Sequence, residues 1–171
     1  MPELVQSERL QPSLLDRLTD NDPGKKVEPL AQRVLSTQRL REDVIENLLS
    51  LLGTTHLAAV SAELPEFPEA ARSVVNYGIP DLAGTTASSI DAGELARAVR
   101  DAVVVFEPRL NKSSLQVRAI VAGERMAHNT LVFEIEGELW ADPTPMRLFL
   151  QTQVDLETGN VAIVPGARGA G

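Results

Sequence analysis

Three glutamates at alternate positions are the most enzyme-like feature of this 171-residue sequence. If Glu134, Glu136 and Glu138 share one face of a strand, neighbouring carboxylates lie roughly 7 Å apart, within the separation that inverting glycoside hydrolases use. A catalytic acid also needs a pKa raised by burial, and an open strand face provides no such desolvation. We therefore expect these glutamates to pair across strands with Arg118 and Arg147, and we predict no catalytic residue.

His56 and His128 are the only histidines, and the chain contains no cysteine. This composition excludes a multi-histidine metal site, a thiolate zinc site, an iron–sulfur cluster and a cysteine nucleophile. Neither histidine has a ligand partner nearby in the sequence or a nucleophile motif such as G-x-S-x-G, so we expect both in loops. The prediction is that the protein binds no metal and no cofactor.

Glu107-Pro108-Arg109 is a charge pair held across a rigid proline. It follows a predicted helix, so the carboxylate meets the negative end of the helix dipole and Arg109 can offset that cost. The spacing leaves two interpretations open: a self-paired connector, or a preoriented pair for a partner, because arginine suits bidentate recognition. The only tyrosine, Tyr77, is likewise either an anchor for the irregular turn 76–82 or an aromatic contact at an interface.

Two periodicities predict the α+β fold that positions these residues. Apolar residues recur at helical spacing over 30–52 and 89–106; Asp91 is the expected N-cap of the second helix, and Pro108 ends it. The period then changes from 3.6 to 2, which predicts strands over 115–121, 131–136, 146–154 and 161–164. We expect N-terminal helices and a central helix to pack on one face of a small antiparallel sheet of about four strands, with the other face wet.

The chain is expected to form one domain with two appendages. Residues 1–29 are interpreted as an N-terminal arm with a short helix, 30–164 as a single α+β domain and 165–171 as a flexible tail. Acidic residues outnumber basic ones by 24 to 16, which gives a net charge of −8 and argues against binding to nucleic acid. With no signal peptide and no apolar stretch long enough to enter a membrane, a cytoplasmic protein is expected.

Four motifs in order resemble the TssE family, the type VI secretion baseplate subunits that are similar to the sheath-initiator wedge protein of contractile phages. They are Pro12-Ser13-Leu14-Leu15-Asp16-Arg17-Leu18, Leu48-Leu49-Ser50-Leu51-Leu52, Asn76-Tyr77-Gly78-Ile79-Pro80-Asp81-Leu82 and Phe106-Glu107-Pro108-Arg109-Leu110. The resemblance extends over nearly the whole chain. Many members carry Asn-Thr-Arg after the leucine-rich helix, where this chain has Gly53-Thr54-Thr55-His56.

The resemblance implies a structural role, without enzymatic activity, in a cytoplasmic baseplate. The implied partners are the wedge subunits TssF, TssG and TssK, the sheath subunits TssB and TssC, and the VgrG spike. In the family the Glu-Pro-Arg motif is implicated in docking on the helical core bundle of the wedge. This favours the interface interpretation of Glu107, Pro108 and Arg109, and we add Tyr77 to the predicted interface.

A strand edge would then start sheath polymerisation by strand addition. Two alternatives stay open: a peptidoglycan glycosidase, in keeping with an old lysozyme-like label of the family, and the equivalent subunit of a phage-tail-like particle. On the baseplate interpretation, Glu107→Ala is expected to leave the isolated fold intact and to weaken wedge assembly.

Overall fold

The structure, a computed structural model, describes residue 24 and residues 37–86, 89–121, 130–140 and 145–164. The predicted arm and its helix, His128 and the tail lie outside these described residues, apart from Gly24. The chain order is α2 (Thr37–Leu52), η3 (Leu57–Ala59), η4 (Leu64–Glu66), α3 (Pro68–Ala71), η5 (Val74–Asn76), α4 (Ala92–Phe106), β1 (Gln116–Val121), β2 (Thr130–Leu139), β3 (Met146–Asp155) and β4 (Val161–Ile163).

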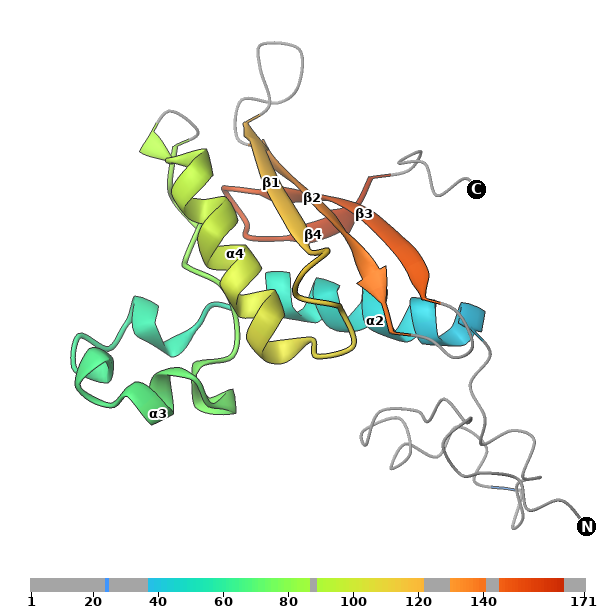
Figure 1. Cartoon of the computed structure of the whole chain (residues 1–171). Coiled ribbons are helices and arrows are strands. Elements are labelled where there is room, and N and C mark those ends of the chain that lie inside the picture. The colour runs from blue at the N-terminus through green and yellow to red at the C-terminus, as the bar shows by residue number, and fades with distance from the viewer. Residues whose placement is uncertain (1–23, 25–36, 87–88, 122–129, 141–144, 165–171) are drawn as a thin grey trace, which may run out of the picture.

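The four strands form one antiparallel sheet in the order β1-β2-β3-β4, which confirms the predicted α+β fold (Figure 1). β2 and β3 pair over their whole length, from Thr130 opposite Asp155 to Leu139 opposite Met146. β4 is much shorter and pairs only with Thr152–Val154 of β3. The first half of β3 therefore lies beyond the end of β4.

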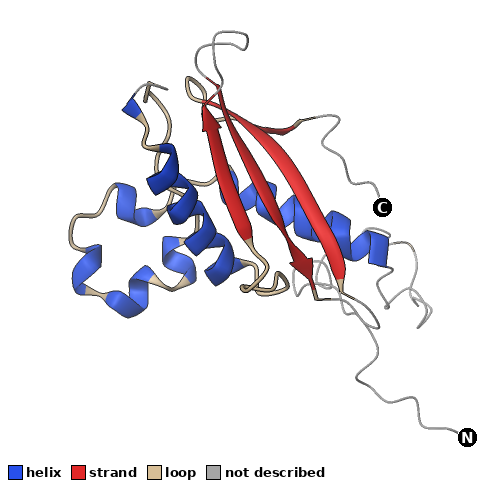
Figure 2. Ribbon diagram, turned by 45° about the horizontal axis from the view of Figure 1, so that its top comes forward, coloured by secondary structure: helices blue, strands red, loops and turns tan. Residues whose placement is uncertain are grey.

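The two long helices cover one face of the sheet, as the helical spacing predicts. α2 crosses behind the strands, and α4 lies alongside β1 (Figure 2). The side chains that form the core between helices and sheet are almost fully buried: Leu40, Val44, Leu48, Leu51, Leu95, Val99, Val103, Leu131, Phe133, Ile135, Leu148, Leu150 and Val154.

The other face of the sheet is less wet than predicted. Val132 points to this face and is only 6% exposed. In the register it lies between Ile120 of β1 and Gln153 of β3, so longer neighbours flank it on both sides. The alternation of a strand predicts which face of the sheet a residue lies on. It does not predict how far side chains of the neighbouring strands bury that residue.

Asp91 caps α4 as predicted. Its carboxylate accepts hydrogen bonds from the backbone N–H groups of Gly93 (2.8 Å) and Glu94 (2.9 Å). Both bonds stabilise the charged form of the carboxylate and hold the pKa of Asp91 below its ordinary value; the bond from Glu94 has the larger effect. The helix ends at Phe106, directly before the Glu-Pro-Arg motif.

Residues 57–76 fold into four short turns that we call the helical lobe. The side chain of Asn76 ties these turns together: its oxygen accepts the Ala58 N–H at 2.9 Å and its nitrogen donates to the Ala71 carbonyl at 2.9 Å. The lobe projects from the side of the molecule remote from β3 (Figures 1 and 2).

Gly78 joins the helical lobe to the core, and only glycine fits there. Its φ is +126°, and a Cβ would lie 2.3 Å from the Thr54 carbonyl oxygen. This close approach lets Ile79 N–H donate to Thr54 O (2.8 Å) and His56 N–H donate to Ile79 O (2.9 Å). The structured turn predicted over residues 76–82 is therefore present, and it pairs with a segment more than 20 residues earlier.

Candidate protein–protein interface

The Glu-Pro-Arg corner, as we call residues 107–109, contains an ion pair whose carboxylate is buried and whose guanidinium is partly exposed. The Glu107 side chain is 3% exposed, and its carboxylate accepts from Arg109 Nε at 2.7 Å and from the terminal guanidinium nitrogen at 2.6 Å. The backbone N–H of Arg109 also donates to Glu107, at 3.2 Å. The Arg109 side chain keeps 22% of its surface exposed, and Pro108 is exposed. Arg109 and Pro108 are thus the parts of the corner that a partner can reach.

The backbone around the corner is fastened to the end of β2. Leu110 forms an antiparallel bridge with Leu139, and Trp140 N–H donates to the Arg109 carbonyl at 2.8 Å. Both leucine side chains are buried. The corner is therefore rigid before any partner arrives, which lowers the entropy that binding would cost.

Trp140 is a candidate interface residue that the sequence motifs do not point to. It is the only tryptophan, its side chain is 63% exposed, and it is the cross-strand neighbour of Arg109. Tryptophan and arginine are the residue types most often found at binding hot spots. The signal available in the sequence was a lone tryptophan at the end of an alternating strand, in a chain with 4% aromatic residues.

Tyr77 lies between the helical lobe and the two long helices, and it is half-buried. Its ring makes an edge-to-face contact with Phe106, with centroids 5.1 Å apart, and its hydroxyl donates to the Asn47 carbonyl at 3.5 Å. These contacts correspond to the anchor interpretation of Tyr77. The structure does not bring Tyr77 into hydrogen-bond contact with the Glu-Pro-Arg corner within the described residues, although Phe106 connects the two.

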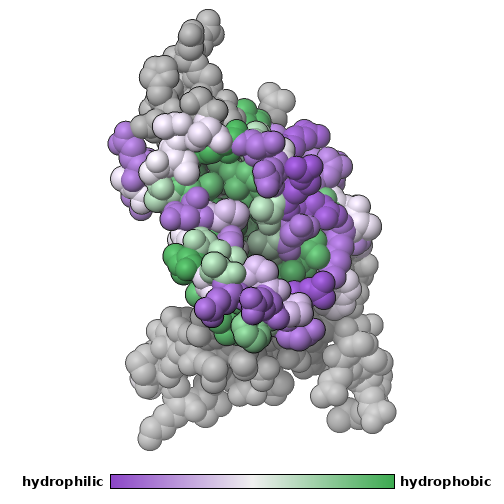
Figure 3. Space-filling model, turned by 90° about the vertical axis from the view of Figure 1, so that its left-hand side faces the viewer, coloured by the Kyte–Doolittle hydropathy of each residue, from purple (hydrophilic) through white to green (hydrophobic). Residues whose placement is uncertain are grey.

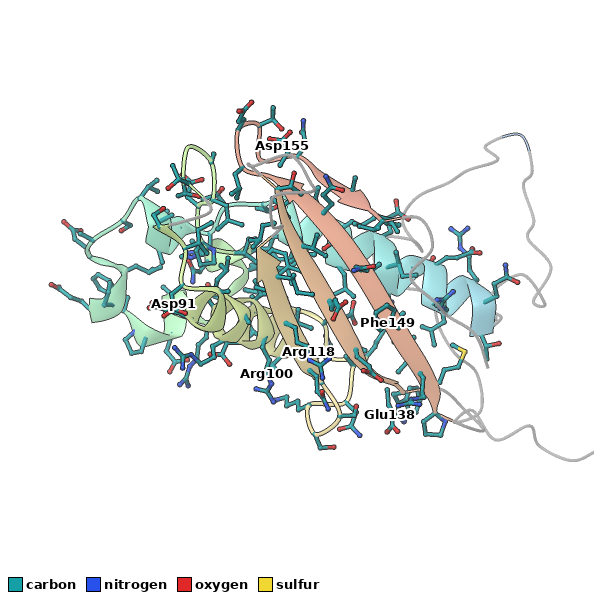
Figure 4. The ribbon with its side chains drawn as sticks, turned by 90° about the horizontal axis from the view of Figure 1, so that it is seen from above. Asp91, Arg100, Arg118, Glu138, Phe149 and Asp155 are labelled. Carbon is teal, nitrogen blue, oxygen red and sulfur yellow. The ribbon has the colours of Figure 1, made fainter. Side chains whose placement is uncertain are left out.

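The three glutamates of β2 lie on the open face of the sheet, as expected. Glu136 pairs with Arg147 at 3.1 Å, and Glu134 accepts from the Gln151 side chain at 3.3 Å. Arg118 faces Glu134 in the register. Figure 4 shows Glu138 at one end of the sheet and Arg118 on the neighbouring strand. Glu134 and Glu136 are half-buried and Glu138 is exposed, so none of the three has the fully buried setting that strongly raises the pKa of a catalytic acid.

His56 lies in the loop after α2, as predicted, and in the described ranges no three histidine or acidic side chains gather into a group that could hold a metal ion. Within the same ranges no helix has the length and apolar character that crossing a bilayer requires.

Among the described residues, nothing pairs with the first half of β3 on the side away from β2. Gln151 O accepts from Val164 N–H, and Asp155 N–H donates to Asn160 O, so the odd-numbered residues of β3 direct their backbone groups away from β2. Arg147 and Phe149 therefore direct an N–H and a C=O each toward this edge, where no described residue pairs with them. Figure 4 places Phe149 midway along β3. We call this stretch, residues 146–150, the open half of β3.

Comparison with known proteins gives a family for this chain. Residues 38–144 match the family described as baseplate wedge protein gp25. No curated protein matches the chain. Among solved structures, a candidate tail lysozyme from Geobacter sulfurreducens is similar, with 23% identity, a TM-score of 0.48, and coverage of 72% of this chain and 96% of that chain. The matched region spans more than half of the chain and includes all but the first residue of α2, together with Tyr77 and the Glu-Pro-Arg corner. The chain therefore belongs to the baseplate wedge protein gp25 family, as the resemblance indicated.

Proposed function

We propose that this protein is a non-enzymatic subunit of the baseplate of a type VI secretion system. In this proposal it docks on the core bundle of the wedge, beside TssF, TssG and TssK, and starts the polymerisation of the TssB–TssC sheath around the VgrG spike. It acts in the cytoplasm, at a baseplate held against the inner membrane. Membership of the baseplate wedge family supports the structural role.

The open half of β3 is the observation that carries the sheath part of the proposal. A strand added there meets the backbone groups of Arg147 and Phe149, and each new hydrogen bond contributes about 1 kcal/mol. Strand addition of this kind gives affinity through the main chain, which suits the repeated joining of identical subunits. The short β4 leaves the necessary room.

A proline at position 149 tests this role of β3. Phe149→Pro removes the N–H that points to the open edge and leaves the β2 ladder intact, because this N–H does not face β2. We expect sheath assembly from TssB and TssC on wedge complexes to fall about fivefold, which corresponds to the loss of one hydrogen bond of about 1 kcal/mol. Phe149→Val keeps the N–H and is the matched control. Normal sheath assembly with a folded Phe149→Pro protein would remove the open half of β3 from the proposal.

The Glu-Pro-Arg corner supports docking on the wedge. Arg109 and Pro108 offer the reachable surface, and Trp140 adds an exposed aromatic side chain next to Arg109. Co-purification with TssF and TssG tests this part. Trp140→Ala changes an exposed side chain, so we expect the fold to persist and wedge binding to weaken, whereas Ile163→Ala on β4, which is also exposed, should bind normally.

A clearing assay on purified peptidoglycan tests the non-enzymatic part. We expect no activity, because Glu134, Glu136 and Glu138 lie on an exposed face and two of them already contact polar side chains. Robust clearing that is lost in Glu134→Gln or Glu136→Gln would establish the glycosidase alternative. Neighbouring genes for a sheath-disassembling ATPase would favour type VI secretion over a phage-tail-like particle.

A further inference from the structure

The helical lobe carries half of the large hydrophobic residues that are exposed in the described part of the chain. Of the eight large hydrophobic side chains that are exposed, four belong to the lobe and a fifth, Val105, belongs to the adjoining α4. The lobe residues are Val60 (80%), Phe67 (57%), Val74 (80%) and Val75 (62%). Figure 3 looks at this side of the molecule and shows apolar groups set among strongly polar ones. Single exposed apolar residues are ordinary, but a group of them indicates an interaction site.

Hydrogen bonds fix the backbone of the lobe, which distinguishes the lobe from an ordinary exposed loop. Asn76 fastens Ala58 to Ala71, and the Ser73 hydroxyl accepts from Val75 N–H at 3.3 Å. The bridge between Thr55 and Ile79 closes its base. These contacts present Val74 and Val75 on a preformed surface, so a partner would not have to order it.

A hollow of about 190 Å³ lies between the lobe and α4. Small and apolar residues make up most of its lining, among them Ala98, Ala102 and Val105. Asp101 also lines it and has a side chain 79% exposed, with Arg100 only loosely paired at 3.9 Å. The Arg100 guanidinium donates instead to the carbonyls of Leu115 and Lys112. The Asp101 carboxylate is therefore available to a second cation.

The charge around the apolar residues is mainly negative. Glu63, Glu66 and Glu69 are exposed on the lobe, and Arg72 is the one basic residue of the segment 57–76. Asp101 adds a fourth carboxylate on the α4 side. A complementary surface therefore carries apolar residues together with lysine or arginine.

We propose that the helical lobe binds a basic amphipathic segment of a partner protein. The apolar residues of this segment cover Val74, Val75 and Val105, and one lysine or arginine lays its aliphatic stem in the hollow with its cation beside Asp101. The surface lies away from the open half of β3 (Figures 1 and 2), so this contact is separate from the proposed sheath contact. It does not depend on the baseplate assignment.

A titration of the full ¹⁵N-labelled chain with synthetic peptides tests the proposal by nuclear magnetic resonance. The probe is a helical amphipathic peptide of leucine and arginine, and the control peptide has glutamate at each arginine. We expect shifts confined to residues 57–76 and 98–106 with the arginine peptide, and binding at least about tenfold weaker with the glutamate peptide.

Variants make the test specific to the lobe. The double change Val74→Glu/Val75→Glu alters two exposed side chains, so the chain should fold and lose binding about tenfold or more. Asp101→Asn should weaken binding of the arginine peptide, and Ile120→Glu, which changes an exposed residue of the sheet, should leave binding unchanged. Shifts spread over the sheet, equal binding of both peptides, or unchanged binding by the lobe variants would overturn the proposal. Concentration-dependent shifts of the lobe without peptide would mean that a second copy covers it, and would also overturn it.

Discussion

Removing one member of the Glu-Pro-Arg corner should cost stability, contrary to the expectation from sequence that Glu107→Ala leaves the isolated fold unaffected. Glu107 is 3% exposed and accepts three hydrogen bonds from Arg109. Breaking a buried ion pair from one side costs about 3–5 kcal/mol. Because Arg109 keeps 22% of its side chain exposed, water replaces part of the lost interaction, and we expect about 2–4 kcal/mol for Glu107→Ala.

Arg109→Ala should be at least as damaging, since it leaves a buried carboxylate without its cation. A charge-free pair, Glu107→Leu/Arg109→Met, should recover most of the lost stability. Its free energy of unfolding should lie within about 1.5 kcal/mol of that of the parent. Urea unfolding of the full chain, followed both by circular dichroism and by Trp140 fluorescence, measures these differences. Single variants within about 0.5 kcal/mol of the parent, or a charge-free pair as unstable as the sum of the single changes, would refute the reasoning.

The charge-free pair also separates the two interpretations of the corner. If Glu107 and Arg109 serve only to connect helix and strand, the charge-free pair should bind TssF and TssG as the parent does. If Arg109 is recognised by the wedge, the charge-free pair should be stable and still fail to co-purify. Normal co-purification of that variant would remove the charges of the corner from the docking surface.

Three further changes test the architecture. Gly78→Ala should destabilise by about 3–5 kcal/mol in urea, because two backbone hydrogen bonds (about 1 kcal/mol each) are lost and a strained backbone adds about 1–3 kcal/mol. Gly159→Ala serves as the control. Gly159 has a φ of +71° and an added Cβ would meet no atom within 4 Å, so this change should lower the free energy of unfolding by only about 1 kcal/mol. Thr152→Val should stabilise by about 1 kcal/mol, since the buried Thr152 hydroxyl has no hydrogen-bond partner among the described residues. Asp91→Asn should lower the melting temperature at neutral pH. The fold lowers the pKa of Asp91, so the charged carboxylate stabilises the fold at pH values above its ordinary pKa. The difference in melting temperature between parent and variant should therefore vanish as the pH falls through the pKa of folded Asp91.

The elements of this fold could be predicted because their patterns are local. Helical spacing located α2 and α4, and alternation located four strands, since each signal needs only neighbouring residues. The pairing of Glu107 with Arg109 was also within reach, because a single proline separates them. These are properties of short stretches of chain.

The features that support the proposed function depend on contacts between distant residues, and these contacts could not be predicted. Glu107 belongs to a corner held by the bridge between Leu110 and Leu139, which are 29 positions apart. The need for glycine at 78 comes from the Thr54 carbonyl, and the open half of β3 exists because β4 pairs with only three residues. The local sequence around Gly78 does not reveal the Thr54 carbonyl, and the local sequence of β3 does not reveal how far β4 pairs with it.

The short β4 has a consequence for the protein outside its assembly. An unpaired strand edge is a template for any extended chain, including a second copy or a partly folded one. The isolated protein should therefore be prone to aggregate when it is produced in large amounts. If the proposed strand addition is correct, co-expression with the sheath subunits should raise its soluble yield.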